Sequence, residues 1–276
     1  MFQLFITLVS GLPDFRGAQG FWRAYPPLQK LNISLSGMSN PEWFDRDPQF
    51  AWGFFGHRYN LYKTAEPHEG FKILLNWGKR KELGYFAFTS NVDGHFQRAG
   101  FDEDKVIECH GTINYMQMAD TDINDEIWRV PEGTSYNVDM ETLRLQGDLP
   151  QGPPNADPTN QALARPNILM FGDWGWQSDR TDAQYRNFHK FRSNLSKACA
   201  QDANKDSPCD LVVVEIGAGL AVPTVRIQSE ELAASRQYKG VLIRINPNEP
   251  QVPSPKKNIS LPMKGLEALK AIDKLL

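Results

Sequence analysis

The segment LVVVEIGAGL, residues 211–220, is a short apolar run that stops at a turn containing glycine. Four other segments have the same form: YFAFTS (85–90), VIEC (106–109), NILMF (167–171) and VLIRI (241–245). Short apolar runs bounded by polar or glycine residues are typical of buried strands. Strands that are apolar along nearly their whole length favour a parallel sheet covered on both faces, so these segments predict such a sheet.

Helical patterns separate the predicted strands. Asp47-Pro48 has the form of a helix N-cap followed by proline at the first helical position, and aromatic residues at helical spacing come after it. Further helical patterns begin at Pro67, cover residues 185–198, begin at Pro223 and occupy residues 264–276. Strands that alternate with helices indicate an α/β fold with a doubly wound parallel, Rossmann-like sheet.

Two segments interrupt this alternation and predict a smaller helical and loop-rich lobe formed by insertions. Residues 21–80 are helical in pattern and rich in aromatic side chains, and residues 112–164 are polar and rich in proline and glycine. We expect one domain over residues 1–276, in which 21–80 is a helical insertion, 112–164 is a loop-rich insertion and the remainder is the Rossmann-like core.

The sequence argues against nucleic acid and membrane partners. The 276 residues include 33 acidic and 30 basic side chains, which gives a formal net charge of -3, and no basic cluster suits a phosphate backbone. The apolar N-terminal segment, residues 1–13, is far shorter than the ~20 apolar residues of a membrane span and is interpreted as a core strand. Three scattered cysteines fit a reducing compartment and an intracellular protein, cytoplasmic or nuclear.

Polar and glycine residues collect where the predicted strands end. These turns are Ser90-Asn91-Val92-Asp93-Gly94, His110-Gly111, Gly172-Asp173, Gly217-Ala218-Gly219 and Asn246-Pro247-Asn248. In open α/β sheets, ligands bind outside the carboxyl ends of the strands, because helix N-termini and free backbone N–H groups converge there. The pattern therefore predicts a nucleotide-type site.

The order of these motifs resembles that of the Sir2 (sirtuin) family of NAD-dependent protein deacylases. The motifs that carry the resemblance are GLPDFRG (11–17), SNVDG (90–94), CHG (109–111), RPNILMFGD (165–173), EIGAGL (215–220) and INPN (245–248). The resemblance implies cleavage of NAD to nicotinamide and transfer of an acyl group from lysine to ADP-ribose. It also implies an acylated-lysine protein or peptide as the substrate.

The resemblance assigns the catalytic residues. His110 matches the family's general base, which needs a pKa near the working pH. Asn91 matches the residue that holds the nicotinamide ribose or a water near it, and Asp93 the acceptor of the nicotinamide carboxamide. Ser90 stands where the family has Gln. A structural role for His110, and an Asx turn at residues 91–93, remain alternatives.

Other residues match the family's binding motifs. Asp14, Phe15 and Arg16 match the loop that shields the reactive centre and contacts the cofactor. Gly217, Ala218 and Gly219 match a turn that lets backbone approach the phosphates or the adenosine ribose, and Asn246 matches a residue that binds this ribose. Phe171, Gly172 and Asp173 match a segment whose backbone pairs with the peptide substrate. Trp174 and Trp176 either narrow the peptide cleft or pack in the core.

The chain departs from the family pattern in two places. No cysteine lies between His110 and Arg165, where most sirtuins carry two CxxC pairs, so no structural zinc is expected. The glycine loop that cradles the pyrophosphate is replaced by FITLVS (5–10), which would weaken NAD binding. Three hypotheses follow: an NAD-dependent deacylase, a Sir2-like NAD hydrolase or ADP-ribosyltransferase, or a catalytically impaired protein that keeps the fold.

Overall fold

The computed structural model describes residues 2–7, 18–123, 125–154, 162–201 and 210–276. Its larger lobe is built on a six-stranded sheet in the order β11-β10-β9-β1-β2-β3. The strands are β1 (Phe2–Thr7), β2 (Tyr85–Thr89), β3 (Val106–Glu108), β9 (Asp210–Ile216), β10 (Lys239–Ile245) and β11 (Ile259–Leu261). All neighbouring strands pair in parallel. The parallel sheet is therefore confirmed, and the N-terminal segment supplies one of its inner strands.

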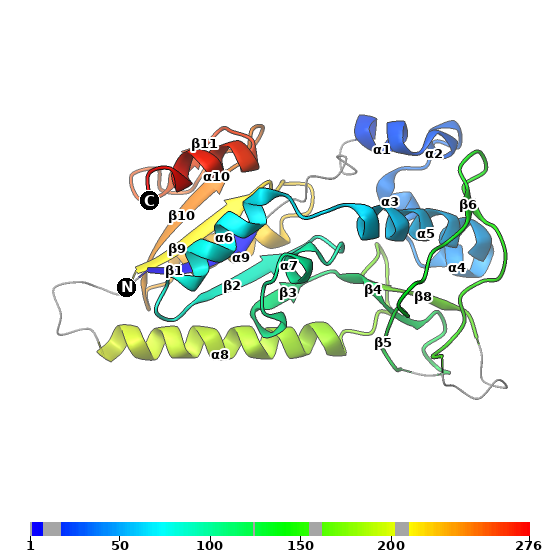
Figure 1. Ribbon diagram of the computed structural model, residues 1–276, viewed down its shortest axis with the longest axis horizontal. Helices are drawn as coiled ribbons and strands as arrows, with labels where there is room; N and C mark the ends of the chain where they lie inside the picture. Colours follow the sequence, from blue (N-terminus) through cyan, green and yellow to red (C-terminus); the bar gives the residue numbers. More distant parts are fainter. Residues whose placement is uncertain (1, 8–17, 124, 155–161, 202–209) are drawn as a thin grey trace.

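Helices cover both faces of this sheet (Figure 1). One hydrophobic cluster joins the sheet to α6 (Glu69–Lys79), α7 (His95–Arg98) and α10 (Gly265–Asp273). A separate cluster joins the opposite face to α8 (Asp179–Gln201) and α9 (Thr224–Ala234). Strand β2 shows the division, since Tyr85 and Ala87 belong to the first cluster and Phe86 and Phe88 to the second. Alternate residues of a strand point to opposite faces, so the sheet is doubly wound.

The smaller lobe lies beside the sheet and has its own hydrophobic core (Figure 1). Its helices are α1 (Ala18–Ala24), α2 (Pro26–Lys30), α3 (Leu35–Met38), α4 (Glu42–Arg46) and α5 (Pro48–Thr64). A three-stranded antiparallel sheet of β4 (Gly111–Met118), β5 (Trp128–Arg129) and β8 (Ala164–Ile168) packs with them, as does the hairpin of β6 (Val138–Asp139) and β7 (Arg144–Leu145). The predicted N-cap of α5 is present, because Asp47 Oδ1 accepts the Phe50 N–H at 3.2 Å.

One predicted strand was assigned to the wrong sheet. NILMF (167–171) was expected in the parallel sheet, but β8 ends at Ile168 and pairs antiparallel to β4 in the smaller lobe. All five residues of β8 are buried, because the core of the smaller lobe covers them. A short apolar run indicates a strand that is buried on both faces, but it does not indicate which sheet the strand joins.

The insertion boundaries of 21–80 and 112–164 stay predictions. Helix α6 lies inside the first range but packs with the large sheet, whereas α1 to α5 pack in the smaller lobe. Cys199 on α8 is disulfide-bonded and Cys109 is a buried free thiol. Among the described residues, no helix has the length and apolar character needed to cross a bilayer.

Candidate functional site

The turns that follow β2, β3, β9 and β10 lie along one edge of the large sheet. This follows from the parallel pairing of the strands, which places all their carboxyl ends on the same side. The edge carries four of the five predicted polar turns. Asp14, Phe15 and Arg16 lie outside the described residues. The fifth turn, Gly172-Asp173, belongs to the smaller lobe because it follows β8, and its predicted place at the end of a parallel strand is wrong.

His110 lies where the two lobes meet. It follows Cys109, whose N–H donates to the carbonyl oxygen of Thr89 at the end of β2 at 2.9 Å. The carbonyl oxygen of His110 accepts the N–H of Leu169, just beyond β8, at 3.0 Å. The backbone on both sides of the imidazole is thus bonded, once to the parallel sheet and once to the smaller lobe.

The turn after β2 places Asn91 and Asp93 next to the end of β3. The Asn91 N–H donates to Thr89 Oγ1 at 3.0 Å. Asp93 is buried, and its Oδ1 accepts the His95 N–H at 2.9 Å at the start of α7. This bond is the Asx-type cap that was the alternative to a nicotinamide contact. The cap occupies one carboxylate oxygen, and the contact of Asp93 with nicotinamide stays a prediction.

Arg58 on α5 was missed by the sequence analysis. Its Nε donates to the hydroxyl of Tyr62 at 2.8 Å. Burial opposes the positive charge, but Tyr62, Tyr25 and Asp93 outweigh it and hold the pKa of Arg58 above its usual value. A half-buried cation therefore interacts electrostatically with Asp93, the predicted nicotinamide contact. Its position in a helix dominated by aromatic residues gave no signal in the sequence.

Glu108, the last residue of β3, joins this strand to α8. Its Oε2 lies 2.6 Å from Arg180, and its backbone N–H donates to Gln184 Oε1 at 3.0 Å. Burial raises the pKa of the Glu108 carboxyl, and the Arg180 guanidinium partly opposes this shift. These contacts fix the end of β3 two residues before His110. The position of Glu108 directly before the CHG motif could have identified it.

Arg180 and Gln184 also line a cavity of about 570 Å³. Its other walls include the acidic residues Glu103, Asp104, Asp125 and Asp179. None of the predicted site residues that the structure describes lines it. The cavity lies along the first turns of α8.

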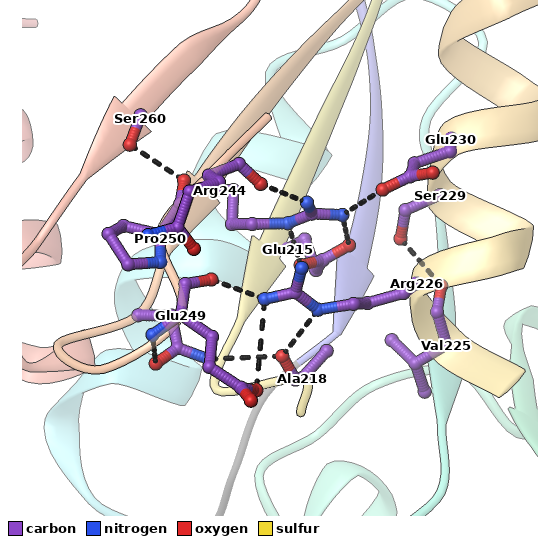
Figure 2. Close-up of polar contacts among 12 residues, drawn as sticks. Glu215, Ala218, Val225, Arg226, Ser229, Glu230, Arg244, Glu249, Pro250 and Ser260 are labelled. Carbon is purple, nitrogen blue, oxygen red and sulfur yellow. Dashed lines mark hydrogen bonds and ion pairs between the residues drawn. The ribbon is translucent and has the colours of Figure 1, made fainter. Parts of the chain in front are cut away.

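The glycine turn after β9 is bonded to the turn after β10 (Figure 2). Gly217 has a φ of 69°, in the left-handed region that favours glycine. The carbonyl oxygen of Ala218 accepts both Asn246 Nδ2 and Arg226 Nε at 3.0 Å. The Oδ1 of Asn246 accepts the N–H groups of Asn248 and Glu249 at 2.9 and 3.0 Å. The structure thus brings the predicted residues Ala218 and Asn246 together, with Asn246 organising both turns.

Glu249 was missed by the sequence analysis and lies at this turn. Its Oε2 accepts the Leu220 N–H at 2.9 Å. A β-carbon on Gly219 would meet only this same oxygen, at 3.4 Å. The turn therefore leaves space beside Gly219, and the Glu249 carboxylate borders that space. A carboxylate accepts hydrogen bonds from the hydroxyls of a ribose, whereas it repels a phosphate.

A buried ion pair lies beneath the turn (Figure 2). Arg244 and Glu215 are register partners on β10 and β9. Arg244 Nε and Nη2 donate to the two carboxylate oxygens of Glu215 at 2.5 and 2.9 Å, and Nη2 also donates to Glu230 of α9 at 2.7 Å. Both side chains of the central pair are at most 1% exposed. This pair holds the ends of β9 and β10 together.

The segment Phe171-Gly172-Asp173 is held by the side chain of Asp173. The two carboxylate oxygens of Asp173 accept hydrogen bonds from Nη1 and Nη2 of Arg165 at 2.8 and 2.9 Å. They also accept the N–H groups of Met170 and Gly175, both at 3.2 Å. The Asp173 side chain is 1% exposed, so it shapes the loop from inside. Contact with a substrate through the backbone of residues 171–173 stays a prediction.

The Sir2 family model matches residues 6–191. The chain belongs to the Sir2 family. Over 270 residues, this Sir2-family chain is 29% identical to an NAD-dependent protein deacylase of Deinococcus radiodurans, and the alignment covers 96% of the chain and 89% of that protein. It is 31% identical over 168 residues to an NAD-dependent protein deacylase of Aquifex aeolicus, an alignment that covers 61% of the chain but only 58% of that protein.

Solved sirtuin structures share the fold of this Sir2-family chain. One, described as the structural basis of sirtuin substrate affinity, has a TM-score of 0.58 at 19% identity, over 99% of this chain and 93% of that chain. Another, described as Sir2 bound to acetylated peptide, has a TM-score of 0.54 at 17% identity, over 99% of this chain and 92% of that chain. The Rossmann-like fold with a smaller helical lobe is thereby confirmed.

Proposed function

We propose that this chain is an NAD-dependent protein-lysine deacylase that cleaves NAD to nicotinamide and transfers the acyl group to ADP-ribose. Membership of the Sir2 family and the names of the Deinococcus and Aquifex relatives support the proposal. The observation that carries it is the position of His110, at the end of a parallel strand and bonded through its backbone to the smaller lobe. A general base in that position lies beside the crevice in which the fold binds nucleotides.

The residues at the carboxyl edge fit NAD at its adenosine end. Glu249 offers a carboxylate oxygen beside the open face of Gly219, and a carboxylate near a glycine turn is how many Rossmann-like folds bind a ribose hydroxyl. Asn246 and Arg226 hold the turn in shape through Ala218. At the other end, Asn91 and Asp93 would contact the nicotinamide ribose and carboxamide.

The chain's own residues supply acid–base chemistry. When NAD is bound, it supplies the electrophilic ribose carbon that receives the acyl oxygen. His110 would then take a proton from a ribose hydroxyl, which an imidazole does well near neutral pH. Glu108 contributes indirectly, because its bonds to α8 fix the strand that carries His110.

We also propose that the smaller lobe is stable without zinc. Among the described residues, no group of three or more His, Cys, Asp or Glu is arranged to hold a metal. The lobe has its own hydrophobic core, and the Trp52 indole N–H, buried within it, donates to the carbonyl oxygen of Ala164 at 2.9 Å. A metal chelator should therefore leave the melting temperature unchanged, and a fall would contradict the proposal.

Nicotinamide release from NAD tests the main proposal. Release should require an acetyl-lysine peptide and should fall by about 10²-fold or more in His110→Ala, while His189→Ala, at an exposed position of α8, keeps it. Release without peptide would favour an NAD hydrolase or ADP-ribosyltransferase. Absence of release together with an NAD-induced rise in melting temperature would favour a binding protein that keeps the fold.

A further inference from the structure

Three large apolar side chains are exposed within six residues of the loop that follows β8. Leu169 is 36% exposed, Phe171 is 48% exposed and Trp174 is 99% exposed, whereas Met170 between them is 4% exposed. Single exposed apolar side chains are common on protein surfaces, but three within six residues make this loop a candidate interaction surface. Trp174 contacts no core, so of the two interpretations of its role, core packing is wrong.

This rim patch, Leu169, Phe171 and Trp174, begins at the candidate catalytic residue. The Leu169 N–H donates to the carbonyl oxygen of His110 at 3.0 Å. Residues 169 and 171 are exposed on either side of buried Met170, as expected for alternate residues of an extended segment, whose side chains lie about 7 Å apart. The rim patch therefore begins at a residue bonded directly to the backbone of His110.

The loop that carries the patch is held in one shape. Asp173 and Arg165 form a bidentate ion pair whose side chains are 1% and 2% exposed. Gly172 has a φ of 72°, and no atom lies within 4 Å of the position of a β-carbon there. Beyond the turn, Gln117 Nε2 donates to the carbonyl oxygen of Gly175 at 2.7 Å. The backbone that carries the rim patch is therefore fixed in advance, so less conformational entropy of the loop is lost on binding.

Backbone pairing alone gives this segment little capacity to select a ligand. The N–H of Leu169 is bonded to His110, that of Met170 to Asp173, and that of Phe171 to the carbonyl oxygen of Ser39 at 2.9 Å. An extended peptide added at this edge cannot use these three donors. Pairing at this edge would rely on carbonyl groups, which every residue carries, so selectivity for a ligand would come from side-chain contacts with the rim patch.

We propose that the rim patch binds an apolar side chain next to the acyl-lysine of the substrate peptide, and that Trp174 is its main specificity-determining residue. The inference rests on the proposed deacylase function, which supplies the peptide. The patch residues carry no charge, so they select against charged neighbours of the acyl-lysine. Aromatic side chains such as tryptophan contribute most to interfaces of this kind.

Binding of fluorescently labelled acetyl-lysine peptides tests the proposal. One peptide has leucine on both sides of the acetyl-lysine and the other has serine. The wild-type chain should prefer the leucine peptide, and Trp174→Ala should weaken its binding about tenfold, as expected from loss of one buried apolar contact. The serine peptide should bind both chains alike. Trp174→Phe should keep much of the preference, and Ile259→Ala, an exposed apolar residue at the far edge of the sheet, should keep all of it.

Equal binding of the two peptides by the wild-type chain, or an unchanged preference in Trp174→Ala, would overturn the proposal. A change of oligomeric state in Trp174→Ala, seen by size-exclusion chromatography, would instead assign the patch to a second copy of the chain. Nicotinamide release is measured separately on the same proteins. A preference that depends on Trp174 without any release would leave a peptide-binding site and contradict only the deacylase function.

Discussion

Gly111 and Asn167 approach each other so closely that a β-carbon on Gly111 would lie 2.1 Å from the carbonyl oxygen of Asn167. Gly111 also has a φ of 71°, in a region that side chains other than glycine rarely adopt. The contact brings β4 against β8 immediately after His110, where Gly111 pairs with Ile168. The glycine of the His-Gly motif is therefore required by packing between two strands.

Gly111→Ala should destabilise the chain much more than Gly172→Ala. Both glycines have left-handed φ values, 71° and 72°, but a β-carbon on Gly172 meets nothing within 4 Å. Gly172→Ala should therefore cost only the ~1–2 kcal/mol of the left-handed conformation, whereas Gly111→Ala must also displace backbone. Urea denaturation measures the free energy of unfolding of both variants. Equal losses would show that β8 moves aside without cost.

Asp173→Asn should reduce the free energy of unfolding by ~3–5 kcal/mol, because it leaves the charge of Arg165 buried without a counterion. The double variant Arg165→Met/Asp173→Leu should recover part of this loss, since it removes both charges. Recovery should be incomplete, because the N–H groups of Met170 and Gly175 lose their acceptor. A double variant less stable than Asp173→Asn would contradict this account.

The sequence predicts the large sheet well because its signals are local. Apolar runs and the polar turns after them identify β2, β3, β9 and β10, and Asp47-Pro48 identifies the start of α5. The convergence of His110 and Asn91 follows from the rule that parallel strands end on the same side. The sequence does not predict β8 in the antiparallel sheet, since its burial depends on a lobe assembled from distant segments.

Pairs of charges across strands are predicted least well. Glu215 and Arg244 each interrupt an apolar run, and nothing local shows that they become register partners. The same holds for Glu108 and Arg180, which are 72 residues apart. Such contacts depend on register and on helix packing, neither of which is visible in the spacing of apolar residues.

The two acidic partners of Arg244 should differ greatly in their contribution to stability. Glu215→Gln should cost ~3–5 kcal/mol, because this side chain is 0% exposed and neutralises a buried guanidinium. Glu230 is 40% exposed, so Glu230→Gln should cost about 0–1 kcal/mol. The free energies of unfolding of both variants, measured at low and high salt, check this. Similar losses of stability in Glu215→Gln and Glu230→Gln would mean that solvent reaches Arg244.

Glu108 should give the chain a pH-dependent stability of defined sign. Its pKa is raised above 4.5, first by burial and despite Arg180, so the folded state binds more protons than the unfolded state between 4.5 and the raised value. The contribution of Glu108 to the free energy of unfolding should therefore be complete below about pH 4.5 and should fall as the pH rises through that window.

Glu108→Gln should remove this slope, so the difference in free energy of unfolding between wild type and variant should decline with rising pH. Arg180→Met should extend the decline to higher pH, because it removes the charge that opposes the rise in the pKa of Glu108. Asp102→Asn is the matched control. The hydrogen bond from Lys105 lowers the pKa of Asp102, so its contribution should be lost as the pH falls. If the difference in free energy of unfolding between wild type and Glu108→Gln instead grows with rising pH, Arg180 lowers the pKa of Glu108 more than burial raises it.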